Sequence, residues 1–352
     1  MTVRLVDVAR TAGVSLATAS RALTGRAGVS PAVADRIRGI ARELGYVANP
    51  HARTLAGGAT STVGLIVHQI DDPYFAEIAA GVLGRAGERD LLVQINHSGR
   101  DPATELRQVR HLVAQRVDVI VIAGSGYHDP AHQAAVRAEL SGYQAAGGRV
   151  TVIGRHALGV DAVLPENRAG ARTVTGHLLA LGHRRIAVAA GTRRLTTVTD
   201  RLAGAAEALA GAGLRLDADV PVVTAEFTTA GGREAAARIR RDHPGITAVV
   251  ALSDAMAIGV LATLRAHRVR VPEDISVVGF DDVAVAADLA PALTTVRLPM
   301  AEMGRQALAL ALTPRSARPR RRMAGHRLVV RDSTGPAPAG RPAGWAPVGS
   351  GP

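Results

Sequence analysis

The residues from Leu16 to Arg21 carry side chains that can contact the base edges of DNA. Arg21 can donate two hydrogen bonds to N7 and O6 of one guanine. Leu16 and Ala17 can make only apolar contacts, for example with a thymine methyl group. Thr18 and Ser20 can hydrogen-bond to a base or to a phosphate. These residue types predict a surface that reads the major groove.

Two short helices joined by a tight turn would position these side chains. Apolar residues recur at helical spacing in three N-terminal segments, and Gly13 separates the first two. Ser15 can cap the second helix, expected at 16–23, and Ser30 with Pro31 can begin the third. The inward residues are Leu5, Val8, Ala9 and Ala12, then Ala19 and Leu23, then Val33, Ile37, Ile40 and Leu44. This is helix-turn-helix spacing; a three-helix packing module without a DNA role remains the alternative.

A second group of residues could bind a small polar ligand. It consists of Tyr74, Phe75, Arg201, Phe227, Asp254 and Asp281. A sugar needs flat apolar walls for its ring faces and charged donors and acceptors for its hydroxyls, and this group supplies both. The alternative is that the aromatic side chains belong to the core and the charged ones cap helices. For Asp254 the two interpretations are equally supported, and Phe280 is expected in the core.

Alternating strands and helices would place this second group. Buried strands are expected at 62–67, 91–95, 117–123 and 149–153, and again near 185–190, 220–223, 246–252 and 275–280. Helical stretches at about 75–87, 103–115 and 130–146 lie between the first four. Such alternation indicates βαβ units with parallel sheets, and its repetition indicates two similar lobes. Ligands of open α/β sheets bind beyond the carboxyl ends of the strands, where several of these residues lie.

Composition narrows the functional classes. The 352 residues have a net charge of +12, all of the positive charge is arginine, and cysteine is absent. Residues 1–58 carry eight arginines and three acids, a net +5 that suits a nucleic-acid partner. We expect no catalytic residues, because no Ser/His/Asp motif appears in its proper context, and we expect no cofactor. We expect no metal site either, because His128 and His132 lack an acidic or cysteine partner in a metal-ligand pattern. Without a signal peptide or spanning stretch, a cytoplasmic protein is expected.

Short motifs spread along nearly the whole chain resemble the LacI/GalR family of bacterial repressors. They are Asp7-Val8-Ala9, Gly13-Val14-Ser15, Thr18-Ala19-Ser20-Arg21, Leu44-Gly45-Tyr46, Ala52-Arg53-Thr54-Leu55, Val63-Gly64-Leu65-Ile66, Asp72-Pro73-Tyr74-Phe75, Leu181-Gly182-His183, Asp200-Arg201-Leu202, Val271-Pro272-Glu273-Asp274 and Pro291-Ala292-Leu293-Thr294. Each motif alone is weak, but this order is specific. The resemblance implies a small all-α helix-turn-helix domain and an α/β two-lobed periplasmic-binding-protein-like domain, with parallel sheets flanked by helices.

The resemblance also implies roles and boundaries. We expect a helix-turn-helix domain at 1–47, a hinge at 48–60, a ligand-binding and dimerisation domain at 61–333, and a disordered tail at 334–352. The hinge would become helical on DNA and insert Leu55 into the minor groove; contact with the sensor is the alternative. Arg201 and Asp281 match the family's ligand positions. The resemblance therefore implies a homodimer that binds a palindromic operator and is controlled by a sugar. A purine effector remains open, and a sugar-transport protein is a weaker alternative.

Overall fold

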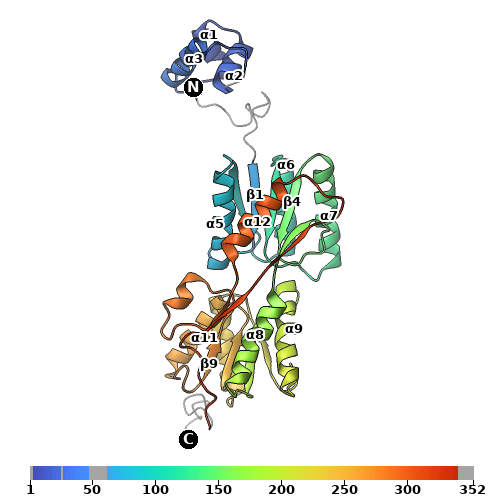
Figure 1. The fold of residues 1–352 in the computed structure, drawn as a ribbon, viewed down its shortest axis with the longest axis vertical. Helices are drawn as coiled ribbons and strands as arrows, with labels where there is room; N and C mark the ends of the chain where they lie inside the picture. Colours follow the sequence, from blue (N-terminus) through green and yellow to red (C-terminus); the bar gives the residue numbers. More distant parts are fainter. Residues whose placement is uncertain (1–2, 25–26, 47–61, 340–352) are drawn as a thin grey trace. The chain divides into compact units, whose positions relative to one another are not determined.

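The computed structural model describes residues 3–24, 27–46 and 62–339. The chain divides into two compact units (Figure 1). One comprises Met1–Thr62 with Asp90–Leu92, and the other comprises Val63–Arg89 with Val93–Pro352. The expected hinge at 48–60, including Leu55, lies outside the described residues.

Within residues 3–24 and 27–46, the N-terminal unit contains three short helices, as the sequence predicts. They are α1 (Leu5–Ala12), α2 (Leu16–Thr24) and α3 (Pro31–Glu43). Gly13 ends α1 with a φ of 66°, a left-handed conformation that glycine adopts without strain. Small residues allow the helices to approach closely around Ile37, which is fully buried. The core residues are Val8, Ala9, Ala12, Ala19, Ala22, Ala34, Ile37 and Ala41.

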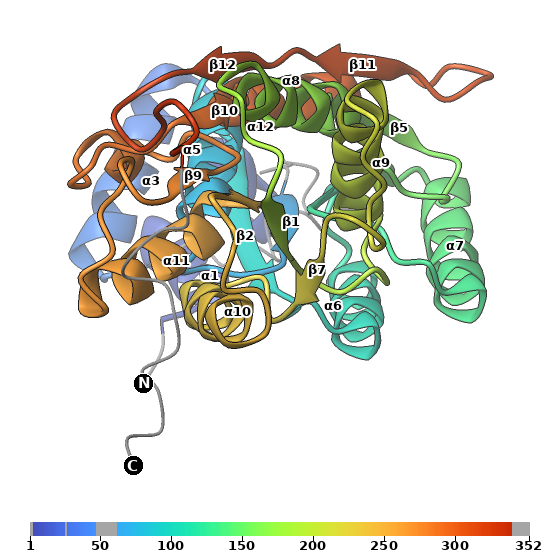
Figure 2. The ribbon, with the colours of Figure 1, turned by 90° about the horizontal axis from the view of Figure 1, so that it is seen from below.

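The second unit begins with a lobe that has helices on both faces of a six-stranded sheet (Figures 1 and 2). The strand order is β11-β5-β4-β3-β1-β2. The strands are β1 (Thr62–Val67), β2 (Leu92–His97), β3 (Val119–Ala123), β4 (Arg149–Ile153), β5 (Asp161–Pro165) and β11 (Arg321–Ala324). The helices are α5 (Pro73–Gly87), α6 (Pro102–Ala114), α7 (Pro130–Ala145) and α12 (Met300–Leu312). Every residue of β3 is buried, as expected for a strand covered on both faces.

Two glycines let α5 and α12 pack against each other at very short range. A Cβ atom built on Gly81 would lie 1.8 Å from the carbonyl oxygen of Ala301, and one on Gly304 would lie 2.1 Å from that of Ile78. No side chain larger than hydrogen fits at these distances. The α5–α12 pair is therefore held together by backbone contact across the two helices.

The second lobe contains a four-stranded sheet in the order β7-β6-β8-β9. All three neighbouring pairs are parallel. Its strands are β6 (Ile186–Ala190), β7 (Val222–Thr224), β8 (Ala248–Ala251) and β9 (Ser276–Val278). Its helices are α8 (Asn167–Ala180), α9 (Thr196–Gly211), α10 (Thr229–Asp242), α11 (Asp254–Ala266) and the 3₁₀ turn η1 (Ala284–Ala287). The two lobes thus repeat one architecture.

The chain passes between the lobes after β5, after β10 (Thr295–Arg297) and after β11. β10 pairs antiparallel with β12 (Arg327–Val329), which lies directly after β11 in the chain. Figures 1 and 2 show β11 and β12 as one extended run along the side of both lobes. Three connections thus join the two lobes.

The basic run 318–322 leads directly into a strand of the first sheet. Arg321 and Arg322 belong to β11, which pairs in parallel with β5. The Arg320 backbone N–H donates to Asp161 Oδ1 at 2.7 Å, and its guanidinium pairs with the same carboxylate. An acid on β5 thus fixes the register of an arginine-rich strand, a contact that sequence pattern alone does not indicate.

The ordered chain also continues beyond residue 333, where a disordered tail was expected to start. Thr334 Oγ1 is 3.0 Å from His177 Nε2, and the Ala337 N–H donates to the carbonyl of Leu181 at 2.8 Å. Residues 340–352 of that expected tail lie outside the described part of the chain.

Candidate functional sites

The first candidate site is the exposed face of α2. Leu16 is 51% exposed, which is high for a leucine, and Ala17 and Arg21 are also exposed. Ser20 is half-buried on the same helix, whereas Ala19 and Ala22 lie in the three-helix core. The helix therefore divides into a core face and an outward face, as the sequence predicts.

Thr18 has a structural role that the sequence interpretation did not include. Its backbone N–H donates to Ser15 Oγ at 3.1 Å, and its hydroxyl lies 2.8 Å from the same oxygen. Ser15 therefore caps α2 through Thr18. The Thr18 hydroxyl can still accept a hydrogen bond, but its orientation is fixed by the cap.

The second candidate site is a cleft between the lobes of the second unit. It is lined by residues that follow the carboxyl ends of strands in both sheets. The lining comprises His68, Asp72, Tyr74, Phe75, Arg100, Gly124, Ser125, Leu195, Thr197, Val198, Arg201, Phe227 and Asp281. The structure thus brings together Tyr74, Phe75, Arg201, Phe227 and Asp281, five of the six residues that the sequence analysis grouped.

A buried ion pair forms the wall from the second lobe. Arg201 Nη2 donates to Asp281 Oδ1 at 2.8 Å, Nε donates to Asn167 Oδ1 at 2.8 Å, and Nη1 donates to the carbonyl of Leu252. The Arg201 guanidinium also lies 3.7 Å from the ring centroid of Phe280, which is buried as expected. Burial raises the pKa of Asp281, and the attraction of the Arg201 guanidinium opposes that rise. The three hydrogen bonds hold the Arg201 side chain in place without a ligand.

A neutral histidine organises the wall from the first lobe. His68 Nε2 is 3.0 Å from the carbonyl oxygen of Ser125, and Nδ1 is 3.2 Å from Ser98 Oγ and 3.3 Å from the Tyr127 hydroxyl. Burial lowers the pKa of His68 to about 4, so the ring is uncharged at neutral pH. The sequence analysis missed His68, although its position directly after β1 was an available signal.

Arg100 occupies the middle of the cleft and was also missed. Its guanidinium carbon lies 5.8 Å from the ring centroid of Phe75 and 5.7 Å from that of Phe227, on the opposite lobe. Arg100 Nη2 also pairs with Asp72 Oδ2 at 3.0 Å. The cation thus lies within cation–π distance of the two rings that were expected to enclose a ligand.

The lobes are closed around this arginine. The Thr197 N–H donates to Ser125 Oγ across the cleft at 2.9 Å, and Arg155 pairs with Asp200 at 2.7 Å. The remaining cavity is about 30 Å³, room for a few water molecules at most, since one water needs roughly 10–15 Å³ of such volume. A ligand as large as a sugar needs the lobes to separate or Arg100 to move.

Asp254 does not line the cleft, which corrects its assignment as a ligand-binding residue. Its side chain is fully buried. Oδ1 accepts from the Thr295 hydroxyl at 2.6 Å, and Oδ2 accepts from the Val283 N–H at 2.9 Å. Asp254 therefore ties α11 to the segments that follow β9 and precede α12, which is the structural alternative weighed from the sequence.

Two further findings concern the described residues alone. No described helix has the length and apolar character needed to cross a membrane. No three His, Asp or Glu residues in the described ranges come together as a metal site, and His132 pairs instead with Glu105 at 3.0 Å.

Comparisons with known proteins cover both units. Residues 4–49 match the bacterial regulatory proteins of the lacI family, and residues 175–334 match the periplasmic binding protein-like domain. The HTH-type transcriptional regulator CelR of Thermobifida fusca is 35% identical over 339 residues, covering 93% of this chain and 96% of that protein. The HTH-type transcriptional regulator DegA of Bacillus subtilis is 30% identical, covering 96% and 99%.

Solved structures agree with these matches. A structure described as a CelR–cellobiose complex has 33% identity and a TM-score of 0.69, covering 94% of this chain and 99% of that one. A structure of the lac repressor bound to ONPG in the repressed state has 25% identity and a TM-score of 0.82, covering 95% and 100%. This chain therefore belongs to the lacI family of bacterial regulatory proteins and is a helix-turn-helix, DNA-binding transcriptional regulator.

Proposed function

We propose that this regulator is a repressor whose operator affinity is controlled by a neutral sugar bound in the interlobe cleft. The observation that carries the proposal is the buried Arg201–Asp281 pair, which lies in one cleft with Phe75 and Phe227. The pair offers a donor and an acceptor to sugar hydroxyls, and its charges compensate each other. Aromatic rings offer flat apolar surfaces to the ring faces of a sugar.

The sugar is proposed to take the place of Arg100. In the closed cleft the Arg100 guanidinium occupies the space between Phe75 and Phe227. Sugar C–H groups can pack on the same rings when the arginine moves toward Asp72, its existing partner. Tyr74, which also lines the cleft, keeps its hydroxyl protonated, because burial raises its pKa above the ordinary value. It can therefore donate a hydrogen bond to the ligand.

On the DNA side, the outward face of α2 is proposed to read the operator. Arg21 would contact a guanine, Leu16 and Ala17 would make apolar contacts, and Ser20 and Thr18 would hydrogen-bond to bases or phosphates. Two such units on a palindrome require a two-fold homodimer. Leu55 is proposed to insert into the minor groove between the half-sites. The protein would act in the cytoplasm, where its operator lies, and would catalyse no reaction.

Calorimetry with a ligand panel tests the proposal. Cellobiose is the first probe, because it is the sugar in the related CelR complex; other disaccharides, monosaccharides and purine bases complete the panel. One sugar should bind, and Phe227→Leu should weaken it at least tenfold, because the aromatic wall is lost while an apolar residue stays. Thermal unfolding of the variant provides the control for folding. Tight binding of a purine, or unchanged sugar binding by Phe227→Leu, would refute the proposal.

A further inference from the structure

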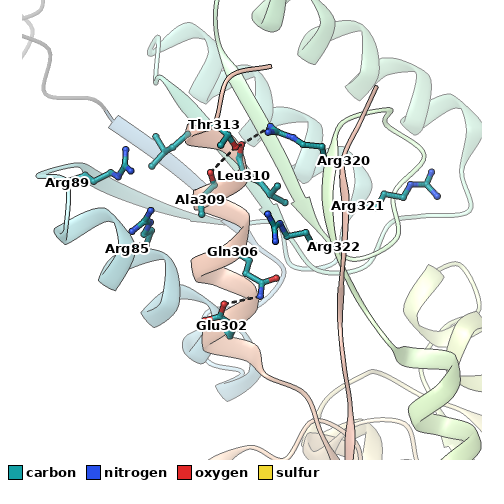
Figure 3. A pocket seen from close by; sticks show the side chains of 11 residues that line it. Arg85, Arg89, Glu302, Gln306, Ala309, Leu310, Thr313, Arg320, Arg321 and Arg322 are labelled. Carbon is teal, nitrogen blue, oxygen red and sulfur yellow. Dashed lines mark hydrogen bonds between the residues drawn. The ribbon is translucent and has the colours of Figure 1, made fainter. Parts of the chain in front are cut away.

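A groove outside the interlobe cleft is lined by arginines from two distant parts of the chain (Figure 3). We call it the arginine groove; its residues are Arg85, Arg89, Glu302, Gln306, Ala309, Leu310, Leu312, Thr313, Arg320, Arg321 and Arg322. Arg85 belongs to α5, Arg89 lies just beyond its end, and the polar residues Glu302 and Gln306 lie on α12. Its volume of about 650 Å³ is in the range of small-molecule pockets.

The arginines of this groove are only partly neutralised. Arg85 pairs with Glu88, and Arg320 pairs with Asp161 and also donates to the carbonyl of Leu310. In the described ranges, neither Arg89 nor Arg322 forms a salt bridge with a carboxylate, and both are exposed. Figure 3 shows the Arg322 side chain directed from β11 toward α12. Arg321, which also lines the groove, has no carboxylate partner among the described residues either, so three uncompensated guanidinium groups lie on the borders of one concave surface.

Two residues that line the groove each carry a polar atom without a hydrogen-bond partner among the described residues. Gln306 Oε1 and Arg85 Nε are buried without a hydrogen bond. A buried polar atom without a partner is costly, and such an atom favours a site that a ligand or a water molecule completes. The Gln306 amide nitrogen donates to Glu302 Oε1 at 2.9 Å, which fixes the Gln306 amide with its oxygen available as an acceptor. The groove therefore offers acceptors as well as cations.

We propose that the arginine groove binds a small phosphorylated metabolite that also carries hydroxyl groups, such as a sugar phosphate. Guanidinium groups match the geometry and charge of a phosphate, so the phosphate would lie against Arg89 and Arg322. Hydroxyls would donate to Gln306 Oε1 and Glu302. Leu310 and Ala309 provide an apolar surface for the carbon skeleton. An inorganic anion would pair only with the arginines. A sugar phosphate would also donate hydrogen bonds to the acceptors of Gln306 and Glu302.

Such a ligand would contact the α5–α12 pair directly. These helices touch at Gly81 and Gly304 and belong to the lobe that begins with β1, the first strand after residues 47–61. Binding would link α5, α12 and β11, three segments that are far apart in the sequence. The arginine groove would thus give the regulator a second input, independent of the interlobe cleft.

Calorimetry on the full chain at constant ionic strength tests this proposal. The probes are glucose 6-phosphate, glucose and inorganic phosphate. The double variant Arg89→Gln with Arg322→Gln removes two of the three uncompensated charges. Arg318→Gln is the matched control, because Arg318 is an exposed arginine of the same basic run and does not line the groove. Asp281→Asn tests whether a probe binds in the interlobe cleft instead of the arginine groove.

Glucose 6-phosphate should bind at least tenfold more tightly than glucose or phosphate. The double variant should lose at least tenfold in affinity, whereas Arg318→Gln and Asp281→Asn should stay within twofold of the wild type. Absence of binding would overturn the proposal, as would equal losses in the double variant and in Arg318→Gln. Equal affinity for inorganic phosphate would mean an adventitious ion only. If Asp281→Asn alone lost affinity for glucose 6-phosphate, the ligand would bind in the interlobe cleft. That result would refute this proposal and leave the proposed function standing.

Discussion

Asp254 and Asp281 follow neighbouring strands of the same sheet, yet their surroundings give them different roles. Asp281 lines the cleft and pairs with Arg201, whereas both oxygens of Asp254 accept hydrogen bonds from Thr295 and Val283 inside the lobe. From the sequence both are acids after an apolar segment. Only the three-dimensional partners decide which one a ligand can reach.

The first prediction concerns pH and Asp254. Burial raises the pKa of Asp254 to about 6, from an ordinary value of 3.8. Between these values the folded protein binds a proton that the unfolded chain has released, so this residue's contribution to stability falls as pH rises from about 4 to 6. The loss is about 1.4 kcal/mol per unit in that window. The free energy of unfolding of Asp254→Asn minus that of the wild type should therefore rise between pH 4 and 6 and stay level from 7 to 8. A difference that is constant over the whole range would show that Asp254 is ionised throughout.

The second prediction concerns Arg21. Arg21→Ala should cost about 1–3 kcal/mol per half-site on the operator, because a bidentate guanine contact is lost. A phosphate contact would weaken operator and unrelated DNA alike. Fluorescence anisotropy with both DNAs separates the cases, and a preserved ratio of the two affinities would remove Arg21 from the base-reading set.

At the scale of helices and strands, close helix contacts decide how firmly the first lobe is built. The α5–α12 pair meets through glycines, and α12 also packs on β3, β4 and β5. This pair supports one side of the arginine groove and leads into the chain segment between β10 and α12 that connects the lobes. Its rigidity therefore matters for both proposed sites.

The third prediction compares two glycines of α5. Gly81→Ala should destabilise the protein by about 1–3 kcal/mol or more, because the added methyl overlaps the Ala301 carbonyl. Gly87→Ala is the matched control, since no atom lies within 4 Å of the Cβ it would add and alanine favours a helix over glycine. Chemical denaturation measures both. A Gly81→Ala protein as stable as Gly87→Ala would contradict the close contact.

Sequence patterns predicted the elements whose signal is local. The three N-terminal helices and strands β1 and β4 follow the expected bounds, because turn residues and apolar runs mark them. β5 and β11 were missed: Asp161 and Pro165 bound a short strand, and β11 begins with arginines. Their pairing joins segments more than 150 residues apart and depends on the Asp161–Arg320 contact, for which the sequence holds no periodic signal. Likewise, His68 and Arg100 became cleft residues only through contacts across the fold.

At the scale of the whole molecule, we propose that a sugar in the interlobe cleft controls DNA binding by the N-terminal helical unit. The closed cleft, with Arg100 between two aromatic rings, is one state of the two-lobed unit. A sugar that favours a different lobe spacing would change how two hinges meet in the dimer. A hundredfold change in operator affinity requires about 2.7 kcal/mol of difference in sugar binding between the two states, a normal coupling energy.

The most direct test is an operator titration of Asp281→Asn with and without the sugar that calorimetry identifies. Asparagine keeps the shape of the side chain, but an amide replaces the carboxyl group that accepts a hydrogen bond from Arg201. Asp288→Asn is the control, because Asp288 is an exposed acid in the same region. Both variants should bind the operator normally without sugar, and Asp281→Asn alone should lose the response. An Asp281→Asn protein that still binds the sugar and responds like the wild type would show that sugar control does not act through this cleft.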